Sequence, residues 1–424
     1  MSIGKRVKKM INRNIPKIRF KEFINNWNNY KLGQLGNFKS GIGFPDSQQG
    51  GTEGIPFFKV SDMNNIGNET EMRNANNYVT QEQIMKNSWK VIDETPAIIF
   101  AKVGAALMLN RKRLVTRPFL IDNNTMSYSF DESWDKDFGL TLFQTINLPK
   151  YAQIGALPSY NASDIAMIKV NVPNVQEQSA IGSLFRTLDS LLSSYKDNLA
   201  NYQALKATML SKMFPKAGQR VPEIRLDGFE EEWEFSSLGD QADITKLAGF
   251  EFTNHVVYSD EGEILAIRGL NVKNQKINLS DVKYIDKSDF SKLDRSKLIE
   301  DDLLFTYVGT VGEVARVPES VLWYLAPNVS RIRLNMALDS RFVLYQISSN
   351  RFKQKQISPL IATSSQPALS MANIRKFIIS FTTLEEQRAI GAYFSNLDNL
   401  INSHQEKISQ LETLKKKLLQ DMFI

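Results

Sequence analysis

The stretch QSAIGSLFRTLDSLLSSYKDNLANYQALKATMLSKMF at residues 178–214 returns 209 positions later, at residues 387–423, as QRAIGAYFSNLDNLINSHQEKISQLETLKKKLLQDMF. The two copies share 14 identities over 37 aligned positions without a gap, far more than unrelated segments share. A second match has an offset of 206, because IPKIRF at residues 15–20 returns as VPEIRL at residues 221–226. Self-similarity at a fixed period indicates a repeated structural unit. The chain is therefore predicted to consist of two tandem copies of one unit.

The repeated block is predicted to form a long helix. Alternating steps of three and four residues from Phe185, or from Phe394, follow a row that is mostly apolar over four heptads. Such a seam is typical of a coiled coil, and neither block contains a proline that would break the helix. The seam is predicted to include Phe185, Leu188, Leu192, Leu199, Met209, Phe394, Leu397, Ile401, Ile408 and Leu418.

Each helix exposes too long an apolar stripe to stand alone, so the two are expected to pair with each other. A parallel pair would place Lys206 opposite Lys415 and Tyr195 opposite His404. An antiparallel pair would set each lysine near an apolar residue, with its stem packed and its charged end in water. We therefore expect an antiparallel coiled coil.

The regions between the repeated blocks read as mixed α/β, because short β-rich runs alternate with Gly, Asn, Asp and Ser turns. Faint echoes link the two regions, such as residues 55–60 with 264–269 and residues 100–104 with 305–309. The predicted domains are a basic arm and opening segment (1–21), a first globular domain (22–175), a central helix (176–216), a second globular domain (217–384) and a C-terminal helix (385–424).

Composition narrows the class of protein. The 424 residues are 42% hydrophobic and 23% charged, as in ordinary globular domains, and no apolar run approaches a membrane span. The absence of cysteine excludes disulfides and thiolate chemistry, and is consistent with a cytoplasmic location. The net charge of +6 is compatible with nucleic-acid binding and equally with an ordinary solvated surface. The same holds for the eight Lys or Arg residues between Lys5 and Lys21, which no acid interrupts.

Familiar catalytic signatures are missing. The only Gly-Lys pair is Gly4-Lys5, so there is no P-loop, and no two prolines are adjacent, which excludes the tetrapeptide with which amino-methyltransferases hold a flipped base. The two histidines, His255 and His404, lie far apart in the sequence, and His404 falls on the helical seam. The sequence therefore favours a recognition protein over an enzyme, with no metal or cofactor site of its own.

Basic and amide side chains in the two globular regions are the candidate DNA contacts. Arginine suits guanine edges, lysine suits phosphates and asparagine reads adenine. A single basic residue is more often a solvated surface charge, so the prediction rests on the group. The candidates are Lys59, Arg111, Lys112, Arg113, Arg117, Asn123, Asn124, Tyr160, Arg268, Lys273, Lys276, Asn328, Arg331, Arg333, Ser364, Ser365 and Gln366.

Two divergent globular regions, helices that open with Gln-x-Ala-Ile-Gly at Gln178 and Gln387, and units that open with Pro-x-Ile-Arg at Pro16 and Pro222 form one combination. Over essentially the whole chain this combination resembles the specificity subunit of type I restriction-modification systems. The resemblance implies that each globular region is a target-recognition domain that reads one half of a bipartite site in double-stranded DNA. It also implies that the coiled coil sets the spacer between the halves and docks two methyltransferase subunits.

Further implications of the resemblance concern partners and cofactors. Restriction subunits would join through the complex, and S-adenosylmethionine, ATP and magnesium would be bound by partner subunits and not by this chain. Two other interpretations remain open: a recognition subunit of a related system whose partner fuses methylation and cleavage, and a coiled-coil adaptor whose two heads bind proteins. Neighbouring genes would distinguish the first, and salt-dependent DNA affinity would argue against the second.

Overall fold

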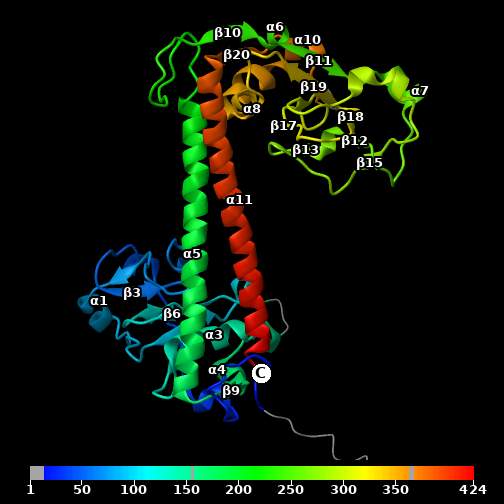
Figure 1. The fold of residues 1–424 in the computed structure, drawn as a ribbon. Helices are drawn as coiled ribbons and strands as arrows, with labels where there is room; N and C mark the ends of the chain where they lie inside the picture. The colour runs from blue at the N-terminus through cyan, green and yellow to red at the C-terminus, as the bar shows by residue number, and fades with distance from the viewer. Residues whose placement is uncertain (1–13, 154–156, 362–366) are drawn as a thin grey trace, which may run out of the picture. The chain divides into compact units, whose positions relative to one another are not determined.

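The computed structural model describes residues 14–153, 157–361 and 367–424. The chain divides into two compact units. Unit 1 comprises Met1–Tyr195 with Lys407–Ile424, and unit 2 comprises Lys196–Glu406. Each unit therefore contains one globular head and a portion of each long helix (Figure 1). We call the globular part of unit 1, up to residue 174, head 1, and residues 213–383 of unit 2 head 2.

Both heads contain a four-stranded antiparallel sheet with the same strand order. In head 1 the order is β2 (Gly36–Ser40), β8 (Thr125–Phe130), β5 (Ala97–Ala101) and β6 (Lys112–Val115). In head 2 it is β11 (Ala242–Lys246), β19 (Val329–Leu334), β16 (Leu303–Thr306) and β17 (Val314–Arg316). The mixed α/β prediction is confirmed, and the duplication extends through the interiors whose sequences have diverged.

A three-stranded sheet follows the same rule. Its middle strand pairs antiparallel with one neighbour and parallel with the other in both heads. The strands are β4 (Tyr78–Val79), β3 (Ile55–Phe58) and β7 (Leu120–Ile121) in head 1, and β15 (Lys283–Tyr284), β12 (Leu265–Ile267) and β18 (Trp323–Leu325) in head 2. The faint echo between residues 55–60 and 264–269 thus marks the two middle strands.

A two-stranded ladder ties the start of each head to its end. It joins β1 (Asn28–Lys31) to β9 (Lys169–Val172) in head 1, and β10 (Glu234–Ser237) to β20 (Ile378–Phe381) in head 2. Head 2 also has a hairpin of β13 (Val272–Lys273) and β14 (Lys276–Ile277). The helices of the heads are α1 (Gln81–Lys86), α2 (Ala105–Met108), α3 (Lys136–Thr145), α4 (Ala162–Ala166), α6 (Leu238–Gln241), α7 (Gly249–His255), α8 (Ser340–Ser348), α9 (Asn350–Phe352), a π-helix (Lys353–Ile357) and α10 (Met371–Arg375).

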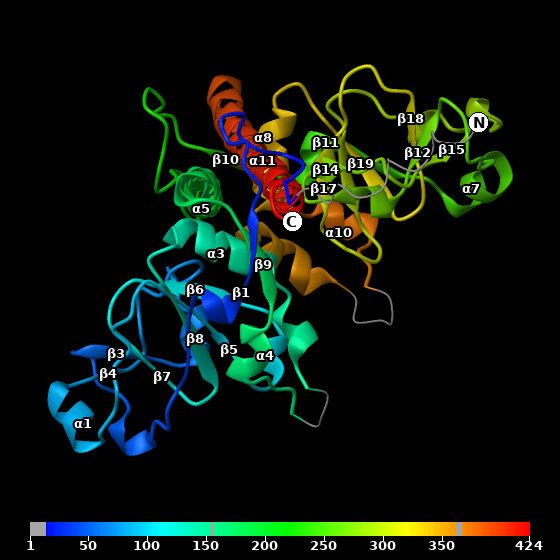
Figure 2. The same ribbon diagram turned by 90° about the horizontal axis from the view of Figure 1, so that it is seen from below.

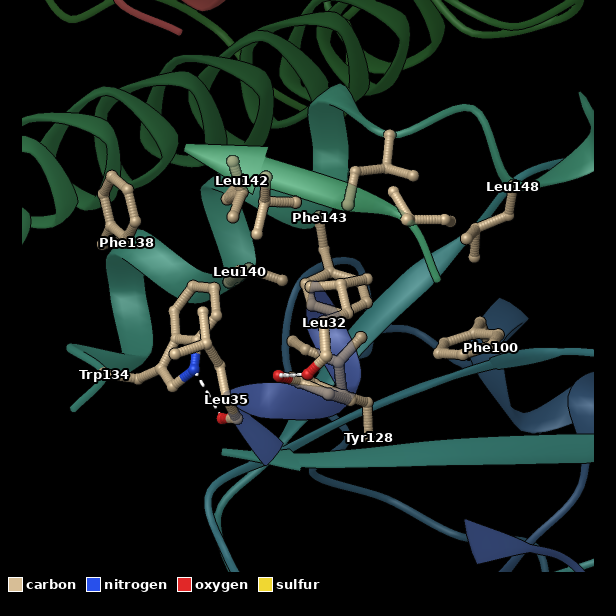
Figure 3. Packing of buried hydrophobic residues seen from close by; sticks show 14 of the residues in the cluster. Leu32, Leu35, Phe100, Tyr128, Trp134, Phe138, Leu140, Leu142, Phe143 and Leu148 are labelled. Carbon is tan, nitrogen blue, oxygen red and sulfur yellow. Dashed lines mark hydrogen bonds between the residues drawn. The ribbon is translucent and has the colours of Figure 1, made fainter. Parts of the chain in front are cut away.

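Aromatic side chains fill the core of head 1 between the four-stranded sheet and α3 (Figure 3). Polar ends of these rings are satisfied by backbone carbonyls: the Tyr128 hydroxyl donates to Leu32 O at 2.9 Å, and Trp134 Nε1 donates to Leu35 O at 2.8 Å. Burying one such side chain stabilises the fold by roughly 1.5–3 kcal/mol. The core of head 2 has the same position and contains Trp233, Phe305 and Phe342.

The two long helices, α5 (Val175–Lys212) and α11 (Leu384–Asp421), run antiparallel within each unit. In unit 1, the ring of Phe185 lies near the start of α5 and that of Phe423 lies just beyond the end of α11. The centres of the two rings are 5.9 Å apart. In unit 2 the end of α5 meets the start of α11. Phe214 follows α5, and the centre of its ring lies 6.3 Å from that of Phe394 near the start of α11. The prediction of antiparallel pairing is therefore confirmed.

The seam is most deeply buried where the helices leave the heads. Its fully buried members are Phe185, Leu188, Leu192, Phe394, Leu397 and Ile401, and its half-buried members are Leu199, Met209, Ile408 and Leu418. The prediction that each seam lysine lies near an apolar residue, with its charged end in water, was wrong. Lys206 Nζ lies 2.6 Å from Asp398 Oδ1, and Lys415 Nζ lies 2.6 Å from Asp189 Oδ1. An ion pair to the opposite helix takes the place of the expected apolar neighbour.

The repeated Gln-x-Ala-Ile-Gly motif fastens each long helix to its own head. Gln178 accepts a hydrogen bond from Asp135 N at 2.9 Å and donates one to Ser133 O at 2.9 Å. Asp135 caps α3, so the glutamine fixes the start of that helix. Gly182 lets the helices approach closely, since a Cβ there would lie 2.6 Å from Phe138 N. Figures 1 and 2 both show α3 beside α5.

The repeated Pro-x-Ile-Arg segment is fastened to the same place. Arg19 donates to both carboxylate oxygens of Glu177, at 2.6 and 2.7 Å, and Arg225 does the same to Glu386 at 2.7 Å. Both glutamates are buried. The backbone of Ile18 donates to Asp421 O at 3.0 Å, and that of Ile224 donates to Lys212 O at 3.1 Å, so each opening segment also contacts the end of a long helix.

A helix that crosses a membrane needs about 20 predominantly apolar residues. Among the helices of the described residues, none combines the length and the apolar character that crossing a membrane requires.

Candidate nucleic-acid interface

The densest basic cluster within a globular region lies at β6, an edge strand of head 1. Successive side chains of a strand point to opposite faces, so Arg111 and Arg113 share one face and Lys112 takes the other. Arg111 Nη1 donates to Asn64 Oδ1, and Arg113 Nη2 donates to Met63 O at 3.4 Å. The two arginines thus hold the segment that follows β3 against the sheet.

Lys112 was predicted to contact DNA, and the structure corrects this. Its side chain points inward and the residue is only 5% exposed. Nζ donates to Ile146 O at 2.6 Å and to Asn110 Oδ1 at 2.8 Å, which ties β6 to the end of α3. Burial lowers the pKa of Lys112 to about 7, because the apolar surroundings disfavour its charge. Lys112 is therefore a structural residue.

The segment held by these arginines is rich in exposed amides. Six asparagines fall between residues 64 and 77, and Asn64, Asn74 and Asn76 are exposed. Arg117 is exposed as well, and its Nη2 donates to Arg73 O at 2.7 Å. We call residues 60–77 the Asn-rich loop. Amide and guanidinium groups side by side can form paired hydrogen bonds with base edges. Sequence reasoning missed this loop, although its asparagine content was the available signal.

Other candidates of head 1 lie at turns. Asn123 and Asn124 are exposed between β7 and β8. Their turn is fixed by Asp122, which accepts hydrogen bonds from Thr125 Oγ1 at 2.6 Å and from Asn124 Nδ2 at 3.3 Å. Lys59 is half-buried and donates to Gln49 Oε1 at 3.1 Å. The two asparagines are the freer of these side chains.

Tyr160 was also predicted to contact DNA, and the structure contradicts this. It is 3% exposed, its hydroxyl donates to Ala101 O, and burial raises the pKa of its phenol. The side chain therefore packs in the core of head 1 and cannot meet a phosphate. The corresponding candidates of head 2, Ser364, Ser365 and Gln366, lie outside the described residues.

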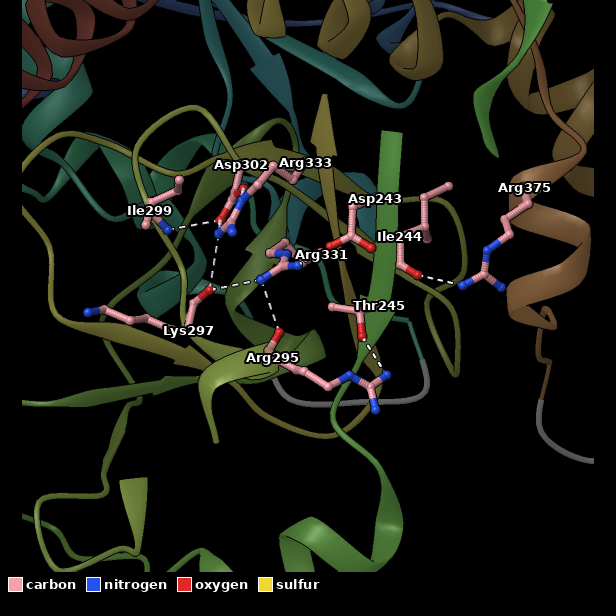
Figure 4. Close-up of polar contacts among 10 residues, drawn as sticks. All are labelled: Asp243, Ile244, Thr245, Arg295, Lys297, Ile299, Asp302, Arg331, Arg333 and Arg375. Atoms are coloured by element: carbon pink, nitrogen blue, oxygen red, sulfur yellow. Dashed lines mark hydrogen bonds and ion pairs between the residues drawn. The ribbon is translucent and has the colours of Figure 1, made fainter. Parts of the chain in front are cut away.

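Arg331 of head 2 was predicted to contact DNA, and the structure contradicts this as well (Figure 4). It is 4% exposed and forms an ion pair with Asp243. Its Nη1 donates to the carbonyls of Arg295 at 3.0 Å and Lys297 at 3.2 Å. The two terminal nitrogens of Arg331 are thus bound within the protein.

Arg333 is engaged in a similar way. Its Nε and Nη2 donate to the two oxygens of Asp302 at 2.7 and 2.8 Å, which raises the pKa of the guanidinium. Asp302 is buried and also accepts from Ile299 N at 2.8 Å. Arg331 and Arg333 together hold residues 295–302 on the sheet.

This arrangement brings exposed cations to β11, one of the two edge strands of the four-stranded sheet of head 2. Arg295 Nη2 donates to Thr245 Oγ1 at 3.2 Å, and Arg375 Nη2 donates to Ile244 O at 2.6 Å (Figure 4). Lys246 Nζ lies 5.2 Å from the centre of the Tyr307 ring. We call Lys246, Arg295 and Arg375 the β11-edge cations.

The β11-edge cations were not predicted from the sequence. One signal was present, because Arg375 occupies the repeat position of Ala166, at the offset of 209. A charge that only one copy carries marks a place where the two heads differ in surface chemistry.

The remaining candidates of head 2 are dispersed. Arg268 donates to Asp281 Oδ1 at 2.7 Å, and Lys276 donates to Asn402 Oδ1 of α11 at 2.7 Å. Lys273 and Asn328 are exposed. Lys276 is therefore committed to a long helix, whereas Lys273 and Asn328 are accessible.

Metal ions in proteins are commonly held by acidic and histidine side chains. Over residues 14–153, 157–361 and 367–424, no three of them gather in a group that could hold a metal ion.

Comparisons with known proteins agree with the duplicated fold. The sequence profile described as "Type I restriction modification DNA specificity domain" matches residues 24–201 and 230–413, more than half of the chain. Two proteins of Methanocaldococcus jannaschii are 23% identical to it. The Type I restriction enzyme MjaVIII specificity subunit aligns over 62% of this chain and 63% of its own length, and the Putative type I restriction enzyme MjaX specificity subunit over 65% and 64%. The alignments thus span less than two thirds of either relative.

A solved structure has a similar fold. It is the S subunit of a Type-I restriction-modification system from M. genitalium, with a TM-score of 0.61 and 14% sequence identity. The similarity covers 97% of this chain and 99% of that one.

Proposed function

The chain belongs to the family of type I restriction-modification specificity subunits, and from this premise we propose that each of its heads reads one half of a bipartite DNA site. The proposal includes three further roles. The helix pair sets the spacer between the half-sites, it docks methyltransferase subunits, and the chain itself is non-catalytic.

One observation carries the proposal of two different half-sites. The heads share one topology, yet their exposed polar groups differ in kind and in place. Head 1 offers the Asn-rich loop with Arg111 and Arg117, and head 2 offers the β11-edge cations. Two equivalent scaffolds with unequal surfaces suit two half-sites of different sequence.

The helices support a fixed spacer. Both α5 and α11 are continuous over 38 residues, and each contributes to both units. Half-site spacing is a geometric property of a dimeric reader, and here two heads on one chain replace the dimer. Adding or removing a whole heptad in the helix pair should therefore change the spacer and leave both half-sites unchanged.

Exposed leucines on the helices support docking of two copies of one partner. Leu191 and Leu414 belong to unit 1, and Leu205 and Leu400 belong to unit 2. They are 42%, 44%, 37% and 41% exposed, and Leu191/Leu400 and Leu205/Leu414 are repeat counterparts at the offset of 209. All four flank the seam on one side by heptad position. Apolar residues that recur in this way suit two identical methyltransferase subunits.

Partners complete the proposal. S-adenosylmethionine, ATP and magnesium would be held by the methyltransferase and restriction subunits, which join through the complex in the cytoplasm. The test is single-molecule methylation sequencing of DNA from cells that express the chain with its methyltransferase partner. A split methyladenine motif with a constant spacer is expected, and its absence would overturn the proposal. Exchange of head 2 alone should alter only one half of that motif.

A further inference from the structure

One lysine joins four elements of unit 2. Lys206 of α5 donates to Asp398 Oδ1 of α11 at 2.6 Å and to Gln275 Oε1 at 2.8 Å. Its Nζ also lies 5.2 Å from the centre of the ring of Tyr345, which belongs to α8. The Tyr345 hydroxyl donates to Asp398 Oδ2 at 2.8 Å and closes the network.

Gln275 lies at the tip of the β13–β14 hairpin of head 2. The two tip residues, Asn274 and Gln275, have φ of 51° and 63°, a backbone region that side chains other than glycine rarely adopt. Positive φ at both central residues is typical of a type I′ turn. Such a turn normally favours glycine at the second of these two residues. Asn274 N donates to Glu313 Oε2 at 2.6 Å, and this glutamate pairs with Lys353 at 3.3 Å. The tip is thus held in its conformation from both sides.

The hairpin also reaches the second long helix, because Lys276 donates to Asn402 Oδ1 at 2.7 Å. Under the tip lies a polar cavity of about 230 Å³, lined among others by Lys206, Gln275 and Lys353. The hydrogen bonds of Gln275 and Lys276 therefore join the hairpin to the two helices beside this cavity. The hold of the hairpin on the helices depends on a few named side chains.

The repeat supplies an internal comparison. Lys415 is the counterpart of Lys206 at the offset of 209, and it makes the same 2.6 Å contact, with Asp189. Counting from the caps Asp135 and Asp339, α3 has Thr141 where α8 has Tyr345. The Thr141 hydroxyl donates to Asp137 O of its own helix at 2.7 Å. Head 1 thus lacks the tyrosine that links head 2 to the ion pair.

We propose that the β13–β14 hairpin is a brace that fixes the orientation of head 2 on the two long helices, with Lys206 as its positioning residue. The brace determines how strictly the second half-site must lie at one distance from the first. This inference rests on the proposed function, because it concerns the spacer of a bipartite site. It assigns Gln275 and Lys276 to the helices rather than to DNA.

The test uses the complex of the full chain with its methyltransferase partner. DNA duplexes carry the methylated motif with its native spacer or with spacers one base pair shorter and longer, and affinity is measured by fluorescence anisotropy. Lys206→Met keeps the stem of the side chain and removes the charge, and Gln275→Gly keeps the turn and removes the contact. Lys415→Met is the matched control. Both brace variants should lower the preference for the native spacer about three- to tenfold, which corresponds to the net contribution of one ordinary hydrogen bond.

Lys415→Met should retain the wild-type spacer preference. Folding is checked by circular dichroism for all variants. If the brace variants bind more weakly at every spacer but keep the wild-type preference, the lysine is merely stabilising and the inference is wrong. A wild-type complex without any spacer preference would overturn the proposed function itself, and the brace with it.

Discussion

Arg19 donates two hydrogen bonds to the buried carboxylate of Glu177, and Trp27 Nε1 donates a third to the same group at 3.1 Å. The opening segment of the unit and the first turn of α5 are thereby joined at one charge. In the second copy Arg225 pairs with Glu386, whereas the buried Trp233 Nε1 has no hydrogen-bond partner in the described part of the chain.

The Arg19 pair should be costly to break. Arg19→Met leaves the Glu177 carboxylate buried without its counter-charge, which typically costs about 3–5 kcal/mol. Urea unfolding should show this loss in free energy, and Arg19→Met combined with Glu177→Gln should recover part of it. A single variant as stable as wild type would contradict this account.

The helix pairing should depend on two ion pairs that the repeat duplicates. Reversing one charge, with Lys206→Asp, sets two acids together and should lower stability by about 1 kcal/mol, since the pair is partly exposed. Adding Asp398→Lys should restore part of the loss, because the ion pair returns whereas the contacts with Gln275 and Tyr345 do not. A double-mutant cycle measures the coupling, and a coupling near zero would show that the pair does not hold the helices.

Gly182 and Gly391 should respond differently to alanine. A Cβ at Gly182 would lie 2.6 Å from Phe138 N, whereas one at Gly391 would lie 3.3 Å from Phe342 N and 3.0 Å from Asp339 Oδ1. We expect Gly182→Ala to destabilise by about 1–3 kcal/mol through overpacking. Gly391→Ala should be near neutral, because alanine gains about 1 kcal/mol of helix propensity over glycine. Thermal melting of the two variants gives the comparison, and equal losses would be inconsistent with it.

Lys112 should make stability depend on pH. Its pKa falls from 10.5 to about 7 on folding. The unfolded chain therefore binds more protons between these values, so this group makes stability rise with pH from about 7 to 10.5. Below about 7 both states are protonated and the full cost of the buried charge is present. Lys112→Met should flatten this part of the profile of urea midpoints against pH, and an unchanged slope would refute the assignment.

The β11-edge cations should account for phosphate contacts. Arg295→Ala and Arg375→Ala should each weaken DNA binding by the complex and reduce the slope of log affinity against log salt by about 0.9. Arg220→Ala is the control, since Arg220 is exposed and paired with Glu232 outside the cation group. If the control lowers the slope as much as the two variants do, the edge has no special role.

The long helices and their pairing could be predicted because the sequence contains two copies of the helical block. Two copies with the same seam predicted the helices and their pairing, since chance does not preserve Phe185 with Phe394 and Leu188 with Leu397. The sheets could not be predicted, because β3 pairs with β7 across more than sixty residues of chain and nothing local encodes that partner.

The candidate site was predicted least well. Arg111, Lys112 and Arg113 look alike in sequence, but strand alternation turns Lys112 inward and leaves the arginines on the other face. The charges of Arg331 and Arg333 predict DNA contacts, yet each side chain faces an acid that only the folded sheet brings near. Distant partners of this kind determine which cations remain for a ligand.

Phe423 lies against Trp27, Phe138 and Phe185 of unit 1. Because of these contacts, the two units have all of their residues available at different times during synthesis. Unit 2 is one continuous stretch of chain, Lys196–Glu406, so all of its segments are translated before residues 407–424. Head 1 emerges first but waits for residues 407–424 before its core is complete. The half of the protein that is made first is therefore the half whose core needs residues that are made after all of unit 2.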